Sequence, residues 1–164
     1  MRPRSLPRGS RGVLASYTAS AMERRQRRDN EHPGRDDEHP RREEPRSIRD
    51  FERALEEEAL ISTEFDLPLC VIVARARTRV PREAARQVVA VLRAADLVAK
   101  PEPTEIAVAL PNTEFADAEV VERRLSKTLP GAVTGIAAHR SGDTVQDLLN
   151  RARSAVTRKT PDPG

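Results

Sequence analysis

The stretch LVAKPEPTEIAVAL, residues 97–110, decides the fold of this chain. Two short apolar runs, Leu97–Lys100 and Glu105–Leu110, flank the segment Pro101-Glu102-Pro103-Thr104. Short apolar runs bounded by turn residues are typical of β-strands, and a proline-rich segment between them favours a turn. The stretch therefore predicts two consecutive strands joined by a turn.

Upstream of this hairpin the pattern predicts a helix, a strand and a second helix. The first helix covers 48–62 and begins after Ser47, a capping residue. A β-branched apolar run at 67–74 predicts a buried central strand with helices on one or both of its faces. Pro81 then opens a helix that we expect to end near 93–96.

Downstream of the hairpin the pattern predicts a helix at 115–127, a strand at 132–138 and a final helix at 144–158. The complete order is a helix, then βαββαβ, then a helix. This order is typical of the ferredoxin-like split βαβ arrangement, an α+β fold with helices on one face of a sheet that contains antiparallel pairs. The additional helices are expected at the two ends of the domain.

The composition supports one folded domain. The chain has 164 residues, of which 37% are hydrophobic and 2% aromatic, so it can bury one core but hardly two. The first 46 residues are dense in Arg, Pro, Gly, Ser and acids, which predicts a disordered tail. We therefore expect an arginine-rich tail at 1–46, the domain at 47–160 and a C-terminal tail at 161–164.

The distribution of charge and hydropathy disfavours nucleic acid and membrane as partners. Residues 1–47 hold twelve arginines and eight acidic residues, so the basic excess lies in a tail whose one aromatic residue is Tyr17. Proteins that bind nucleic acid usually place their basic excess on a folded face with aromatic platforms. No run approaches the roughly 20 apolar residues of a membrane-spanning helix, and we expect a cytoplasmic protein.

The cysteine and the tail histidines give no sign of a disulfide or a metal site. Cys70 lies in an apolar run and is the single cysteine, so a buried thiol in a reducing compartment is expected. His32 and His39 recur in a tandem repeat, 29–35 and 36–42. A polar, proline-rich tail does not fix ligand geometry, which favours low-complexity sequence over metal binding.

Several segments arrive in the order and spacing of the GGDEF family, the domains of bacterial diguanylate cyclases. The segment 51–57 resembles the leading helix of that family, and 68–73 is similar to its first strand. The segment 93–100 resembles its Arg-x-x-Asp motif with the strand that follows, and 105–111 resembles the strand after the signature hairpin. The resemblance covers most of 48–160 and implies the same split βαβ core with additional helices.

The signature itself departs from the family. In place of Gly-Gly-Asp-Glu-Phe the chain has Glu102, Pro103, Thr104, Glu105 and Ile106, so that Glu105 alone matches. The family's glycines let backbone approach a nucleotide closely, whereas Pro103 removes an N–H and Glu102 adds bulk and negative charge. The resemblance therefore implies weak binding of GTP.

The acidic residues that hold magnesium in the family are also replaced. The metal-binding Asp of the first strand aligns with Arg75, and the hairpin Asp aligns with Thr104. In the last helix the usual Asp and Tyr are Arg153 and Thr157. One carboxylate, Glu105, cannot hold two magnesium ions. The resemblance thus implies a catalytically inactive relative without a cofactor, and residual cyclase activity is the rival interpretation.

The connection between the first strand and the second helix is short as well. It passes from Arg77 to Pro81 with roughly a dozen residues fewer than in the family, which removes a polar loop that contacts substrate.

The inhibitory cyclic di-GMP site of the family is the part that the chain retains. Arg93, Asp96 and Arg124 occupy its positions, and guanidinium groups are well suited to bind phosphate oxygens and guanine edges. The resemblance implies that cyclic di-GMP binds there. The alternatives are structural: Arg93 favours the dipole of a helix C-terminus, Asp96 caps the turn into the strand, and the fold serves contact with a protein partner.

Two further features lie outside this resemblance. Arg75, Arg77 and Arg79 alternate along a strand end, so they either form a patch for an anion or an acidic partner or simply face solvent. His139 has no Cys, Ser or Asp pairing signal near it in the sequence, which predicts a surface histidine without a catalytic role.

Overall fold

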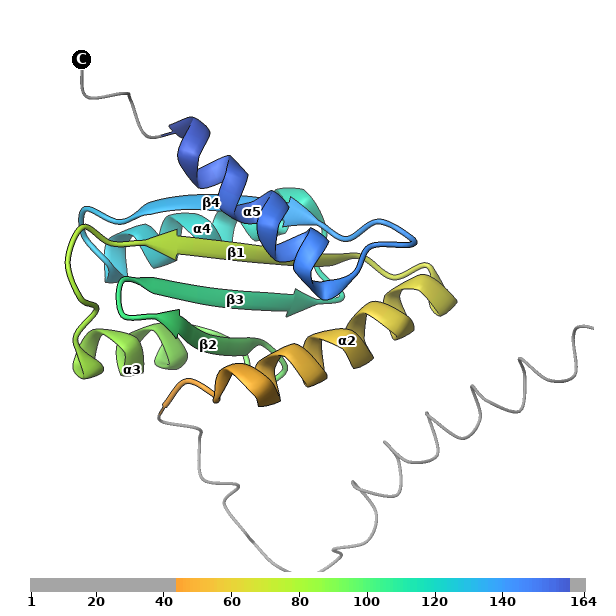
Figure 1. The fold of residues 1–164 in the computed structure, drawn as a ribbon, viewed down its shortest axis with the longest axis horizontal. Helices are drawn as coiled ribbons and strands as arrows, with labels where there is room; N and C mark the ends of the chain where they lie inside the picture. Colours follow the sequence, from red (N-terminus) through yellow and green to blue (C-terminus); the bar gives the residue numbers. More distant parts are fainter. Residues whose placement is uncertain (1–43, 160–164) are drawn as a thin grey trace, which may run out of the picture. The chain divides into compact units, whose positions relative to one another are not determined.

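A four-stranded sheet in the order β2-β3-β1-β4 organises residues 44–159, the part of the chain that the computed structural model describes (Figure 1). The elements are α2 (Ile48–Phe65), β1 (Leu69–Arg75), α3 (Arg82–Ala90), β2 (Leu97–Glu102), β3 (Glu105–Pro111), α4 (Phe115–Thr128), β4 (Val133–Ala138) and α5 (Val145–Lys159). Each neighbouring pair of strands is antiparallel. Since β3 lies between β1 and β2, the predicted split βαβ arrangement and the α+β class are confirmed.

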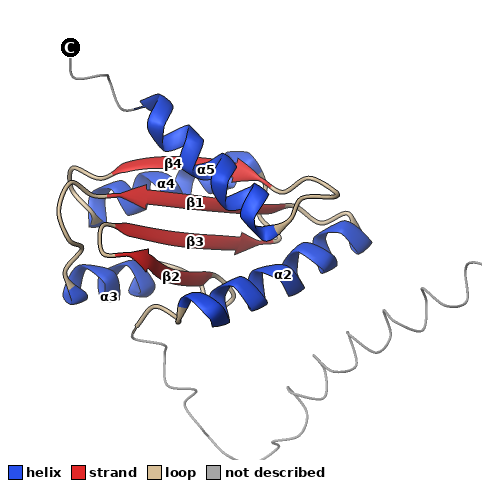
Figure 2. Cartoon of the chain, viewed as in Figure 1, coloured by secondary structure: helices blue, strands red, loops and turns tan. Residues whose placement is uncertain are grey.

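Helices cover both faces of the sheet, and each face has its own core (Figure 2). Alternate residues of β1 point to opposite faces, so Val71 and Val73 pack against α2 and α5, whereas Ile72 packs in the core beneath α3 and α4. Burial on both faces explains why the whole strand is apolar up to Arg75. The predicted buried central strand is confirmed.

Cys70 belongs to the α3 and α4 core and is buried, as expected. Burial in this apolar core, with a smaller contribution from the charge of Glu114, raises the pKa of the Cys70 thiol to about 11. The thiol therefore stays protonated near neutral pH.

The predicted start of α2 is confirmed in its atomic detail. The Ser47 hydroxyl oxygen accepts the backbone N–H of Asp50 at 3.2 Å, and the same hydroxyl donates to the Asp50 carboxylate at 2.7 Å. The helix extends beyond the predicted residue 62 and ends at Phe65, because Asp66 adopts a left-handed conformation with φ of 52°.

The end of α3 differs from the prediction. The helix begins at Arg82, directly after Pro81, but it ends at Ala90 and not near 93–96. The Asp96 carboxylate accepts the backbone N–H of Arg93 at 2.8 Å, and the Asp96 N–H donates to the Arg93 carbonyl at 3.0 Å. This local turn competes with continuation of the helix, so Arg93 lies outside α3.

The residues just before α2 lie along the outer edge of β2. The Arg46 N–H donates to the Val98 carbonyl at 2.8 Å, and Arg46 forms a parallel bridge with Ala99. The Glu44 carboxylate accepts from Arg82 Nε and from Arg86 Nη2, each at 2.9 Å. The rest of the predicted tail, with His32 and His39, and residues 160–164 lie outside the described part of the chain.

A glycine lets α5 pack very closely on the sheet. A Cβ atom at Gly135 of β4 would lie 2.3 Å from the Ala152 carbonyl oxygen and 2.5 Å from the Val156 nitrogen. This close approach is the physical reason for a glycine at this position. It places α5 against β4 and β1. Within residues 44–159, no helix is long and apolar enough to cross a membrane.

Candidate functional site

The remaining signature carboxylate, Glu105, is buried and paired with an arginine on the neighbouring strand. Arg75 and Glu105 are register partners of β1 and β3, and Arg75 Nη2 lies 3.2 Å from Glu105 Oε2. The Glu105 side chain is 3% exposed and that of Arg75 is 44% exposed. The position that resembles a metal-binding aspartate therefore holds a cation against Glu105.

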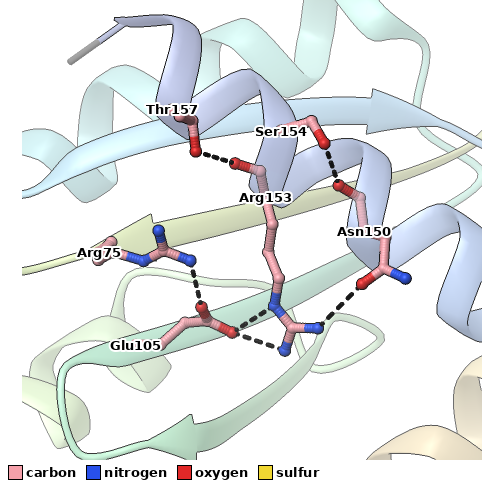
Figure 3. A network of polar contacts seen from close by, with 6 residues as sticks. All are labelled: Arg75, Glu105, Asn150, Arg153, Ser154 and Thr157. Atoms are coloured by element: carbon pink, nitrogen blue, oxygen red, sulfur yellow. Dashed lines mark hydrogen bonds and ion pairs between the residues drawn. The ribbon is translucent and has the colours of Figure 1, made fainter. Parts of the chain in front are cut away.

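A second arginine reaches Glu105 from α5. Arg153 Nε and Nη2 donate to Glu105 Oε1 at 3.0 and 2.8 Å, so each carboxylate oxygen has a guanidinium partner (Figure 3). Figure 3 shows Arg75 and Arg153 pointing at Glu105 from two different layers of the fold. The sequence identified Arg153 as a substitution but not as a partner of Glu105.

These contacts surround the Glu105 carboxylate with positive charge. A magnesium ion needs free carboxylate oxygens, and here the Glu105 oxygens are taken by cations that would repel it. Among residues 44–159, no group of three or more His, Cys, Asp or Glu side chains is placed to hold a metal. Arg75, Glu105 and Arg153 form an ion-pair cluster, which we call the Glu105 cluster.

The short connection after β1 lies against the signature turn. The N–H groups of Ala76 and Val80 donate to the carbonyls of Thr104 and Pro103, each at 2.8 Å. Lys100 Nζ donates to the Val80 carbonyl at 2.6 Å. The carbonyls of the turn are therefore bonded within the chain, and the connection covers the turn.

Arg77 and Arg79 lie in this connection and both are exposed. Because β1 ends at Arg75, the prediction that three arginines alternate along one strand face is wrong. The Ala76 and Val80 N–H groups bond to the carbonyls of the turn between β2 and β3, so the segment after Arg75 lies against that turn and does not continue β1.

Arg93 and Asp96 form a tight pair at the opposite end of β3. Arg93 Nη2 donates to Asp96 Oδ1 at 3.1 Å, and the Asp96 side chain is 1% exposed whereas that of Arg93 is 60% exposed. A buried carboxylate thus anchors an arginine that remains accessible to a ligand.

Thr113 is a further partner of Arg93 that the sequence did not indicate. Arg93 Nη2 donates to Thr113 Oγ1 at 2.7 Å and lies 3.4 Å from the Pro111 carbonyl oxygen. Thr113 is 5% exposed. In the sequence, Thr113 follows the apolar run of β3 by two residues, a position that predicts a loop. Its contact with Arg93 could not be predicted, because the two residues lie 20 positions apart.

Arg124 lies on α4 and is exposed. Among the hydrogen bonds and ion pairs of residues 44–159, none joins its side chain to Arg93 or Asp96. The grouping of these three residues into one ligand site stays a prediction.

His139 contacts a serine from α2 and is half-buried, so the prediction of an unpaired surface histidine is wrong. Ser62 Oγ lies 3.1 Å from His139 Nδ1 and donates to the Leu67 carbonyl at 2.6 Å. Loss of hydration on burial lowers the pKa of His139, with Arg151 acting in the same direction and Asp143 opposing them. The partner lies 77 residues away, too far for a sequence pattern to reveal.

The Ser62 and His139 pair borders a shallow pocket of about 350 Å³. Its other walls include Asp66, Leu67 and Glu114. Because the Ser62 hydroxyl hydrogen is donated to a backbone carbonyl, the pair lacks the geometry of a nucleophile activated by histidine.

No model of a protein family matches the sequence, and no curated protein matches it. Solved structures do resemble the fold. Diguanylate cyclase SiaD from Pseudomonas aeruginosa, in complex with its activator SiaC, is 23% identical with a TM-score of 0.66; the match covers 88% of this chain and 65% of the SiaD chain, just under two thirds.

Two isolated GGDEF domains are similar as well. That of TpbB, or YfiN, from Pseudomonas aeruginosa is 24% identical with a TM-score of 0.62, over 70% of this chain and 83% of that one. That of DgcB from Caulobacter crescentus, in complex with cyclic di-GMP, is 14% identical with a TM-score of 0.60, over 77% and 92%. At such low sequence identity, the similarity concerns the fold alone. Residues 44–159 have the α+β fold of the GGDEF domains of diguanylate cyclases.

Proposed function

We propose that this chain is a catalytically inactive GGDEF-like signalling domain that binds cyclic di-GMP through Arg93, Asp96 and Arg124. The Glu105 cluster is the observation that supports the proposed loss of catalysis. Cyclisation of GTP by two-metal chemistry needs carboxylates that gather magnesium. Here Arg75 and Arg153 bind the Glu105 carboxylate at 2.8–3.2 Å, and among residues 44–159 no group of three or more His, Cys, Asp or Glu side chains is placed to hold a metal.

The geometry of Arg93 supports the ligand-binding part of the proposal. All of its described side-chain hydrogen bonds within residues 44–159 are made by Nη2, which leaves the hydrogens of Nε and Nη1 for a ligand. Guanidinium groups bind phosphate oxygens strongly, and an exposed but anchored one is suited to that task. Asp96 is buried and bonded to Arg93, so its contribution is to orient that side chain.

Similar proteins support the choice of ligand. The structure of the DgcB GGDEF domain is a complex with cyclic di-GMP, and a further microbial GGDEF domain with a TM-score of 0.57 interacts with cyclic di-GMP in a novel mode. The identities are 14% and 15%, so these proteins suggest the ligand and do not identify the contacts.

Titration calorimetry with cyclic di-GMP tests the ligand. We expect binding by the full chain that Arg93→Ala abolishes and Arg124→Ala weakens by about tenfold or more, the usual loss for a charged hydrogen bond. Arg123 is the matched control, since it is the neighbouring exposed arginine on α4. Binding that is absent at high micromolar ligand rejects the proposal, and equal losses in Arg123→Ala and Arg124→Ala reject the role of Arg124.

Incubation with GTP and Mg²⁺ tests the loss of catalysis. We expect no cyclic di-GMP from the full chain. Product that forms over many turnovers, and that is lost in Glu105→Gln, would instead establish residual cyclase activity. The Glu105→Gln variant serves to separate activity of this chain from that of a contaminating cyclase.

A second proposal is that the fold serves contact with a protein partner. The end of α2 supports it, because Leu60 is 67% exposed and Phe65 is 39% exposed. Both side chains offer exposed apolar surface that a partner could bury. If the signalling output of cells is lost in Leu60→Glu but kept in Arg93→Ala, this second function holds and the first does not.

A further inference from the structure

We propose that Thr113 is the positioning residue of the Arg93 site: its hydroxyl oxygen holds the Arg93 guanidinium in the orientation that meets an anionic nucleotide. This inference rests on the proposed function. It adds a residue outside the Arg-x-x-Asp pair and assigns it a role through Arg93, with no ligand contact of its own.

The contact between Arg93 and Thr113 is the shortest that the Arg93 side chain makes within residues 44–159. Nη2 lies 2.7 Å from Thr113 Oγ1, compared with 3.1 Å from Asp96 Oδ1 and 3.4 Å from the Pro111 oxygen. A distance of 2.7 Å is at the short end of the range for N–H···O bonds. Thr113 is therefore a close partner of this nitrogen and no incidental neighbour.

The Thr113 hydroxyl is oriented to accept from Arg93. Its own hydrogen is donated to the Pro111 carbonyl at 3.0 Å, so its lone pairs are left for the arginine. The side chain is 5% exposed, and water competes little for this oxygen. The hydroxyl acts here as a fixed acceptor.

The backbone around Thr113 is itself held. The Thr113 N–H donates to the Pro68 carbonyl at 3.1 Å, which ties the loop after β3 to the entry of β1. Asn112 has a left-handed conformation with φ of 51°, so the chain turns sharply between Pro111 and Thr113. Oγ1 is thus placed by main-chain geometry and not by a free rotamer.

Two anchors fix the plane of the guanidinium. Asp96 and Thr113 both bind Nη2, whereas the Arg93 side chain is otherwise 60% exposed. A long exposed side chain loses rotamer freedom when it binds a ligand, and prior anchoring reduces that loss. Removal of the Thr113 acceptor should therefore weaken ligand binding without removing any atom that touches the ligand.

Two substitutions separate the hydroxyl from the bulk of the side chain. Thr113→Val keeps the shape and removes the acceptor, while Thr113→Ser keeps the acceptor and removes a methyl group. By calorimetry on the full chain with cyclic di-GMP, we expect Thr113→Val to weaken binding about threefold to tenfold, the cost of ordering one long side chain. Thr113→Ser should restore most of the affinity. Thr157→Val, at an exposed threonine on α5, should bind as the unmodified chain does.

A second measurement needs no ligand. The NMR signals of the Arg93 guanidinium can be assigned because they disappear in Arg93→Lys. We expect slow rotation of the terminal nitrogens in the unmodified chain and in Thr113→Ser, and faster rotation in Thr113→Val. A structural role for the Thr113 methyl group alone would lower the melting temperature in Thr113→Ser, which lacks that group, and would not make the rotation follow the hydroxyl.

The binding and NMR measurements test the proposed function and the role of Thr113 separately. If the unmodified chain binds no cyclic di-GMP, the proposed function fails, and the rotation measurement still decides whether Thr113 positions Arg93. Unchanged rotation in Thr113→Val overturns the inference, as does equal weakening of binding by Thr113→Val and Thr113→Ser. Rotation and affinity that both follow the hydroxyl support it.

Discussion

Arg153 of α5 donates two hydrogen bonds to one oxygen of Glu105, a carboxylate that is 3% exposed at the start of β3. The bond joins a helix to a strand 48 residues earlier in the sequence. It makes the Glu105 carboxylate a contact between the sheet and the helix layer that covers it.

Glu105→Ala should destabilise the domain. The change leaves Arg75 and Arg153 facing each other without a counter-charge, and loss of one member of a buried ion pair costs several kcal/mol. Since both arginines are partly exposed, we expect a loss of about 2 kcal/mol in the free energy of unfolding, measured by urea denaturation. Glu102→Ala, at an exposed glutamate of the same hairpin, is the control. A loss in Glu105→Ala of less than about 0.5 kcal/mol, the scale of ordinary surface substitutions, would contradict the structural role.

Gly135→Ala should destabilise the domain through overpacking. The added methyl group would lie 2.3 Å from the Ala152 oxygen and 2.5 Å from the Val156 nitrogen, so α5 has to move away from β4. We expect a loss of about 3 kcal/mol in the free energy of unfolding, the upper part of the usual range for overpacking.

Gly142→Ala is the matched control for that prediction. Nothing lies within 4 Å of a Cβ there, and φ is +90°, so backbone strain is its principal cost. That cost should be about 1 kcal/mol. If Gly142→Ala were as destabilising as Gly135→Ala, the close approach of α5 would not be the reason.

The stability of the domain should fall as the pH drops below 6.5, the ordinary pKa of histidine. Burial lowers the pKa of His139 in the folded state, so the unfolded chain binds the proton more readily. The contribution is therefore fully present above pH 6.5 and is lost as the pH falls from there through the lower folded pKa. Melting temperatures at pH 7.5 and 5.5, roughly one unit to either side of that pKa, measure this contribution. In His139→Asn, the decrease over this interval should be smaller than in the unmodified chain, and an equal decrease in both proteins would refute the assignment.

Cys70 should be unreactive in the folded protein. Burial raises the pKa of its thiol to about 11, and the thiolate is the reactive form. A thiol-specific reagent such as Ellman's reagent at mildly alkaline pH should label the folded chain very slowly and the unfolded chain rapidly. Labelling that is equally fast before and after addition of denaturant would be inconsistent with the buried position.

The sequence predicted the order of the elements because that order depends on local patterns. The continuous apolar run of β1, the capping arrangement at Ser47 and the turn at Pro103 are each contained in a few residues. The end of α3 was misjudged because apolar residues continue past Ala90, while a side chain further on, Asp96, forms a turn of its own.

The candidate site was predictable only where a residue could be compared with a family position. The resemblance marked Arg75, Arg93 and Arg153, but not what they contact. The partners of Arg153 and Arg93, namely Glu105 and Thr113, lie 48 and 20 residues away. Such contacts depend on how α5 and the loop after β3 pack on the sheet, which no local pattern specifies.

The bridge between Arg46 and Ala99 has a consequence for self-association. A bare edge strand is a template onto which another chain can add, and this is how edge-to-edge aggregation begins. The segment that contains Arg46 already pairs with part of the outer edge of β2. The Glu44 carboxylate holds this segment in place through its bonds to two arginines of α3. Chains cut just before α2 should therefore be more prone to form ordered aggregates than chains that keep these few residues.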